Sequence, residues 1–225
     1  MSTTLRSRIV AEFLGSAFLL AAIVGSGIMA DRLAGGNVAL ALLANSVATG
    51  AALVALILAL APISGAHFNP AVTLSEAMLG GIGWREAHAY IAAQMSGAFS
   101  GVASTHLMFG LPLFFASRHT RNGAGLLWSE FVATFGLLSV IYGCSRTRPS
   151  TVPFAVGAYI TAAYWFTAST SFANPAVTLA RAASDTFAGI SPADVPAFLV
   201  AQFAGAVAAT ICLRWMLSHT SEGGK

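Results

Sequence analysis

Two identical Asn-Pro-Ala boxes are the residues of this sequence whose types and spacing most directly suggest chemistry. The segment NPAVTL occurs at 69–74 and again at 174–179. Proline fits the first turn of a helix, and the asparagine before it can cap that helix with its side-chain oxygen. The asparagine then keeps an N–H₂ donor free beside the partial positive charge of the helix N-terminus. Such a pair would hydrogen-bond neutral solutes and repel cations. The box residues are Asn69, Pro70, Ala71, Asn174, Pro175 and Ala176.

Two carboxylates and two amides lie within apolar stretches, also in matching places. Glu12 and Glu130 start similar segments, and Gln94 and Gln202 occur in two others. A carboxylate in lipid is costly unless it is satisfied. One interpretation is a proton relay. The repeated arrangement favours the other, in which each acid and each glutamine supports the loop that carries the Asn-Pro-Ala box of its own half.

The composition requires a lipid environment. Hydrophobic residues make up 56% of the 225 residues and charged residues only 8%, against about 25% charged in soluble domains. This excludes a soluble enzyme, a nucleic-acid-binding protein and a two-domain receptor. We find no nucleophile–base pair or metal-ligand cluster, so we expect no enzyme, no cofactor and no metal. Cys144 and Cys212 are expected to be buried structural thiols.

Six apolar stretches can each cross a bilayer, which takes about 20 residues. They lie at about 9–30, 38–61, 87–109, 125–143, 152–170 and 196–217. The shorter segments 69–79 and 174–184 begin at Asn-Pro and are predicted to be re-entrant half-helices buried at membrane depth. Six spans place both termini on one side. The basic residues of that side are Arg6, Arg8, Arg85, Arg146, Arg148, Arg214 and Lys225, against Arg32, Arg118, Arg121 and Arg181 on the other, which favours cytoplasmic termini.

The chain contains an internal repeat. AEFLGSAFLL at 11–20 matches SEFVATFGLL at 129–138, and AAQMSGAFSG at 92–101 matches VAQFAGAVAA at 200–209, with one NPAVTL segment between each pair. Three spans per half insert the second copy upside down. We therefore predict one all-α membrane domain over 1–225 with an inverted 3+3 repeat, its halves at about 8–110 and 124–217. The two half-helices should meet at their N-termini near the bilayer midplane.

These residues resemble the signature loops of the aquaporin, or major intrinsic protein, family. The resemblance is carried by SGAHFNPAVTL at 64–74, SFANPAVTL at 171–179 and the paired AEF and SEF spans. It implies a homotetramer with one pore per protomer and passive permeation. It also implies a four-residue outer filter at fixed offsets from the asparagines. Those positions here are Thr49, Ala162, Ser171 and Val177.

The filter departs from the family pattern, and its residues indicate which solutes the channel is expected to conduct. Val177 stands where the family usually has arginine, and the other three side chains are small. We therefore expect a wide, weakly charged constriction, similar to bacterial aquaglyceroporins that conduct arsenite. The expected solutes are arsenite, antimonite, methylated arsenicals, glycerol and water. Alternatives are a coupled secondary transporter or a mainly water and polyol channel. The expected location is the bacterial plasma membrane, and nucleic acid is not an expected partner.

Other residues near the boxes are expected to line the pore or to support the structure. Backbone carbonyls of Gly65, Ala66 and His67 are predicted to line its inner part, mirrored by Thr170, Ser171 and Phe172 on the other side. His106 is expected to be a satisfied residue near a helix end. Arg181 shares a helix face with Val177. It could replace the absent charge, but we expect it to reach the surface or to pair with Asp185.

Overall fold

The computed structural model describes residues 3–218, and within them the chain is helical with connecting loops. The α-helices are α1 (Leu5–Leu33), α2 (Val38–Ser64), α3 (Pro70–Leu79), α4 (Trp84–Met108), α5 (Ala124–Thr147), α6 (Val152–Phe166), α7 (Pro175–Arg181) and α8 (Val195–Ser218), with a short 3-10 turn, η1 (Pro149–Thr151), before α6. Lys225 of the predicted topology lies outside the described residues. The six long helices and two half-helices match the predicted architecture.

The long helices differ in how well they suit a bilayer on their own. Within the described residues, α1, α2, α5 and α8 are each long and apolar enough to cross a membrane. Helix α6 ends at Phe166, four residues earlier than predicted. Its 15 residues span only about 22 Å at 1.5 Å per residue. Thr167 is extended, and a turn in which the Thr170 N–H donates to the Thr167 carbonyl follows it on the way to the second Asn-Pro-Ala box, so an irregular segment completes this layer of the bundle.

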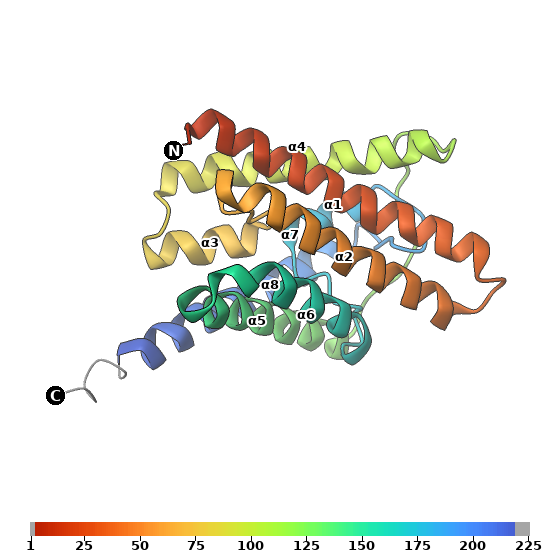
Figure 1. The fold of residues 1–225 in the computed structure, drawn as a ribbon. Helices are drawn as coiled ribbons and strands as arrows, with labels where there is room; N and C mark the ends of the chain where they lie inside the picture. The colour runs from red at the N-terminus through yellow and green to blue at the C-terminus, as the bar shows by residue number, and fades with distance from the viewer. Residues whose placement is uncertain (1–2, 219–225) are drawn as a thin grey trace.

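Each half packs its first and third spans tightly. Helix α1 packs along α4 and α2, α5 packs along α8, and α2 meets α6 across the halves. Small residues allow this approach, because a Cβ atom at Gly97 would collide with the carbonyl oxygen of Phe13 and one at Gly101 with that of Ala17. Figure 1 shows α1 and α4 in the upper part of the view, with α5 and α6 in the lower part.

Each half-helix packs against long helices of both repeats. Helix α3 of the first half packs against α8 as well as α4, and α7 of the second half packs against α4 as well as α8. Figure 1 shows both in the middle layer of the molecule, between the two groups of long helices. Helix α7 ends at Arg181, three residues earlier than predicted, and a turn follows.

The outer surface and the chain ends fit a membrane protein with an even number of crossings. Large apolar side chains such as Phe18, Trp128 and Val200 are more than half exposed, as expected where lipid replaces water. The start of α1 and the end of α8 lie on the same side of the molecule (Figure 1). Cys144 and Cys212 are free and only half-buried, so they are less buried than the sequence predicts.

Candidate pore and selectivity filter

Asparagine side chains cap both half-helices. Asn69 Oδ1 accepts a hydrogen bond from the Ala71 N–H at 2.9 Å, and Asn174 Oδ1 accepts from the N–H groups of Ala176 and Val177 at 3.0 and 3.3 Å. A proline follows each asparagine at the first helical position. Both half-helices therefore begin with the cap geometry that the sequence predicts.

The two boxes are also bonded to each other. Asn69 Nδ2 donates to the carbonyl oxygen of Ala173, and Asn174 Nδ2 donates to that of Phe68, each at 2.8 Å. The expectation of wholly free amide donors is therefore wrong, because each N–H₂ group uses one of its two hydrogens to hold the opposite loop. The second hydrogen of each amide remains, and both asparagines line the central cavity.

The loops before the boxes have an unusual backbone conformation. Ala66, Phe68, Ser171 and Ala173 all have φ between 47° and 52°, a left-handed region that costs non-glycine residues on the order of 1 kcal/mol or more each. They stand three and one positions before each asparagine. The same strained turn is thus built twice.

Buried carboxylates hold these strained loops. Glu12 accepts hydrogen bonds from the His67 and Phe68 N–H groups at 3.0 and 2.7 Å, and Glu130 accepts from those of Phe172 and Ala173 at 2.9 Å each. Both carboxylates are fully buried. Each satisfies loop N–H groups that the unusual turn would otherwise leave without acceptors.

Two glutamines extend the same arrangement toward the half-helices. Gln94 Nε2 donates to Glu12 at 2.7 Å and to Thr73 Oγ1 at 2.9 Å. Gln202 Nε2 donates to Glu130 at 2.6 Å and to Thr178 Oγ1 at 2.8 Å. The four residues singled out from the sequence therefore lie in two equivalent clusters, each joining a long helix to its own loop and half-helix.

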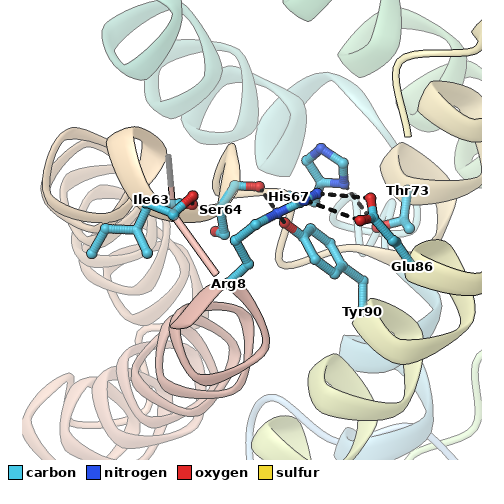
Figure 2. A network of polar contacts seen from close by, with 8 residues as sticks. Arg8, Ile63, Ser64, His67, Thr73, Glu86 and Tyr90 are labelled. Carbon is cyan, nitrogen blue, oxygen red and sulfur yellow. Dashed lines mark hydrogen bonds and ion pairs between the residues drawn. The ribbon is translucent and has the colours of Figure 1, made fainter. Parts of the chain in front are cut away.

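A further polar network fixes the end of α2, where the first loop begins. Figure 2 shows Arg8 of α1 reaching toward Tyr90 and Glu86 of α4. Its Nε donates to the Tyr90 hydroxyl at 2.6 Å, and its terminal nitrogens lie 3.3 and 3.2 Å from the Glu86 carboxylate oxygens. The Tyr90 hydroxyl donates in turn to the Ser64 carbonyl at 2.8 Å. His67 lies beside this network, with its Nδ1 3.0 Å from Thr73 Oγ1.

A cavity of about 480 Å³ runs beside the meeting point of the half-helices. One wall is mostly apolar and is built from helical residues four apart: Leu53 and Ile57 of α2 after Thr49, and Val152, Val156 and Ile160 of α6 before Tyr164, with contributions from α1 and α5. The other wall is the two loops. It includes Gly65, Ala66, His67 and Asn69 from the first half, with Ser171, Phe172 and Asn174 from the second.

The structure corrects one of the four filter positions. Thr49, Ser171 and Val177 line the cavity, but Ala162 is exposed on the outer side of α6 and does not. Tyr164 lines it instead, with its hydroxyl 3.2 Å from Thr49 Oγ1. Ala162 and Tyr164 are two positions apart on α6, and two such positions point in directions about 200° apart around a helix. Counting back from Asn174 therefore gives a residue on the face of α6 that does not line the cavity. The i+4 series that ends at Tyr164 is the signal that could have found it.

Arg181 also differs from its expected placement. It is 2% exposed, and its guanidinium carbon lies 3.3 Å from the centre of the Phe172 ring. Its Nε donates to the Ala188 carbonyl, so it neither reaches the surface nor pairs with Asp185. Arg181 lines the central cavity. The expectation of a filter with four small side chains and no cation is therefore wrong, because Tyr164 and Arg181 line the same cavity as Thr49, Ser171 and Val177.

Arg181 also lines a second cavity of about 220 Å³, which we call the outer chamber. Its lining includes Thr170, His119 and Arg121, so Thr170 lies in this outer chamber rather than in the central cavity. Arg121 donates to the Gly189 and Ser169 carbonyls at 2.8 and 3.3 Å, and burial lowers the pKa of its guanidinium from the ordinary value. These contacts tie the loop after α4 both to the loop after α7 and to the loop between α6 and α7.

Asp185 strengthens the same connection between loops. Arg118 donates to it through the backbone N–H at 2.8 Å and through Nε at 2.9 Å. The backbone N–H and then the side chain of Arg118 hold the pKa of the Asp185 carboxyl below its usual value. His106 contributes from α4, with Nδ1 2.8 Å from the Leu113 carbonyl and Nε2 2.9 Å from Ser184 Oγ, which agrees with the satisfied role expected of it.

Two inverted halves, with half-helices meeting tip to tip beside a cavity, define a helical membrane channel. The profile described as "Major intrinsic protein" matches residues 1–170 and 145–225. The chain belongs to the major intrinsic protein family.

Individual relatives agree with this assignment. The chain is 54% identical over 213 residues to "Aquaglyceroporin AqpS" of Rhizobium meliloti (strain 1021), covering 95% of this chain and 91% of that protein. It is 38% identical to "Aquaporin NIP1-4" of Oryza sativa subsp. japonica, over 63% of this chain and 51% of that protein. The fold is similar to the X-ray structure of the aquaglyceroporin from Plasmodium falciparum, with a TM-score of 0.69, 22% identity, and 92% and 94% of the two chains covered.

Proposed function

We propose that this protein is a passive, bidirectional channel for small uncharged solutes of the aquaglyceroporin type. The observation that carries the proposal is the two-sided lining of the central cavity. Apolar side chains four residues apart form one wall, and the two strained loops with the asparagine pair form the other. A polyol presents carbon on one side and hydroxyls on the other, so such a lining matches it along its length. The 54% identical relative is itself named an aquaglyceroporin.

The proposed solutes are glycerol, water and the neutral hydroxides arsenite and antimonite. The metalloid hydroxides are uncharged near neutral pH and display hydroxyls as a polyol does. Val177 presents an apolar surface at the constriction, which also suits methylated arsenicals. Tyr164 would make the passage narrower than four small side chains would, and its hydroxyl with that of Thr49 would offer a polar edge to a passing solute.

The site residues take roles that follow from their contacts. Asn69 and Asn174 would bond solutes through their remaining amide hydrogens, and Glu12 and Glu130 would keep the loops in shape. We propose further that the protein is a homotetramer in the bacterial plasma membrane with cytoplasmic termini, as the family resemblance and the basic residues suggest.

Flux measurements in proteoliposomes test this proposal. Glycerol and arsenite should equilibrate down their own gradients, at rates that an imposed proton or sodium gradient leaves unchanged. Accumulation driven by either ion gradient would instead establish a coupled secondary transporter, the alternative that intramembrane carboxylates allow. Protein-free liposomes give the background rate, and N69D provides a channel variant with a charge placed between the half-helix ends.

A further inference from the structure

The outer constriction contains a cation at a position other than the one that the family resemblance assigns. Val177 occupies that position, and Arg181 lies one helical turn further along α7. Both side chains line the central cavity. Arg181 alone of the two also lines the outer chamber, so it stands where the two cavities adjoin.

Arg181 is held in place without an ion-pair partner among the described residues. Its Nε donates to the Ala188 carbonyl, and its guanidinium lies over the Phe172 ring. Within residues 3–218 the ion pairs join Arg8 to Glu86 and Arg118 to Asp185, so no carboxylate of that part pairs with Arg181. Its two terminal amino groups have no hydrogen-bond partner among the same residues. The arginine is thus oriented by the protein and has donors left for a solute.

A second polar group without a partner faces the same space. The Ser171 hydroxyl is buried and has no hydrogen-bond partner in the described part of the chain, and Ser171 lines the central cavity. Buried polar groups are almost always bonded, and exceptions at a site suggest a ligand or water. Ser171 and Arg181 both lie close to Phe172. Ser171 is the residue before it in the sequence, and the Arg181 guanidinium lies over its ring.

We propose that Arg181 is the charge-selecting residue of this channel and supplies from one turn away the fixed positive charge that Val177 lacks. This inference rests on the proposed channel function. A solute oxygen that enters from the outer chamber would accept hydrogen bonds from the Arg181 amino groups and exchange hydrogen bonds with the Ser171 hydroxyl. A cation would meet an unpaired positive charge in a wall of low polarity.

Arg121 contributes to the field but is a weaker candidate for this role. Its guanidinium lies 5.0 Å from the Phe172 ring centre, against 3.3 Å for Arg181, and it donates to two loop carbonyls. It lines only the outer chamber. The main contacts of Arg121 therefore hold the loops together, whereas Arg181 lines the central cavity through which solute would pass.

The test compares cation leak with glycerol flux for matched variants in proteoliposomes. Arg181→Met keeps the length of the side chain and removes its charge, and Arg181→Lys keeps the charge. Proton and methylammonium leak should rise about tenfold or more in Arg181→Met, since a nearby unit charge in a low-dielectric wall repels a cation by more than about 2.3 RT, which corresponds to a factor of ten. Glycerol flux should persist. Arg181→Lys should retain most of the exclusion, and the control Arg118→Met should leak as the wild type does.

The double variant Val177→Arg with Arg181→Met returns the cation to the family position and should restore exclusion. If Arg181→Met does not assemble, Arg181→Gln, which can still donate to the Ala188 carbonyl, carries the same expectation. An unchanged leak in a variant that conducts glycerol would overturn the inference. Absence of glycerol flux in the wild type would instead refute the proposed function, so the two failures are distinguishable.

Discussion

At the residue scale, we propose that the Tyr164 side chain sets the width of the outer constriction. It is 3% exposed and lines the cavity, and its hydroxyl faces Thr49 from the opposite half of the bundle. Ala162, two residues earlier, is turned outward. We therefore expect size selection at this site to depend on an aromatic ring rather than on the alanine that a fixed offset predicts.

Removing that ring should admit larger polyols. We expect Tyr164→Ala to raise erythritol or ribitol permeability relative to glycerol by about tenfold, since one methylene in a fitted site is worth roughly 10–200-fold in discrimination. Stopped-flow light scattering of proteoliposomes measures both rates. Ala162→Leu is the matched control and should leave the ratio unchanged. An altered ratio in the control, with none in Tyr164→Ala, would place the constriction against Ala162.

At the scale of elements, the half-helices are positioned by the long helices through buried carboxylates. Each loop adopts φ values that would be unfavourable alone. The carboxylate of Glu12 or Glu130 accepts hydrogen bonds from the loop N–H groups and so offsets this cost. Gln94 and Gln202 connect the same acids to α3 and α7 through threonine hydroxyls. Half-helix position therefore depends on a few charge-assisted hydrogen bonds per repeat.

Neutralising one acid should loosen its half-helix. Glu130→Gln turns one acceptor oxygen into a donor that faces N–H groups, so we expect a loss of about 1–3 kcal/mol in the free energy of unfolding. Thermal unfolding in detergent should show this as a lower Tm, with solute flux reduced. The control Glu86→Gln changes a half-exposed pair with Arg8, which should cost less than about 1 kcal/mol. Equal Tm values for both variants would contradict the supporting role.

Much of this element-level arrangement is predictable from the sequence. The repeated NPAVTL segments predict the two half-helices, and the matched positions of Glu12 and Glu130 point to equivalent contacts. The face of α6 that lines the cavity is not predictable from a fixed number of residues before Asn174. The loop between α6 and the second Asn-Pro-Ala box determines this relation, and the sequence does not reveal the path of that loop. The placement of Arg181 is not predictable either, because its acceptor, the Ala188 carbonyl, belongs to an irregular turn.

At the scale of the whole molecule, the inverted repeat places two half-helix ends at one point and brings two different loops to one wall. The cross-bonds between Asn69 and Ala173 and between Asn174 and Phe68 join the halves at that point. Differences between the halves, such as the shorter α6 and the shorter α7, concentrate at the outer constriction. We therefore propose that the symmetric part of the molecule forms the solute path and that the asymmetric part determines which solutes enter it.

The most direct test of this account is whether solute passes beside Val177. In a background without Cys144 and Cys212, Val177→Cys places a thiol in the cavity lining, and Ala162→Cys places one on the exposed outer face of α6. The measurement is glycerol flux in proteoliposomes before and after treatment with Hg²⁺ or a small methanethiosulfonate. We predict block of Val177→Cys, reversed by a reducing thiol, and no change in Ala162→Cys. Undiminished glycerol flux through fully modified Val177→Cys would contradict the pore described here.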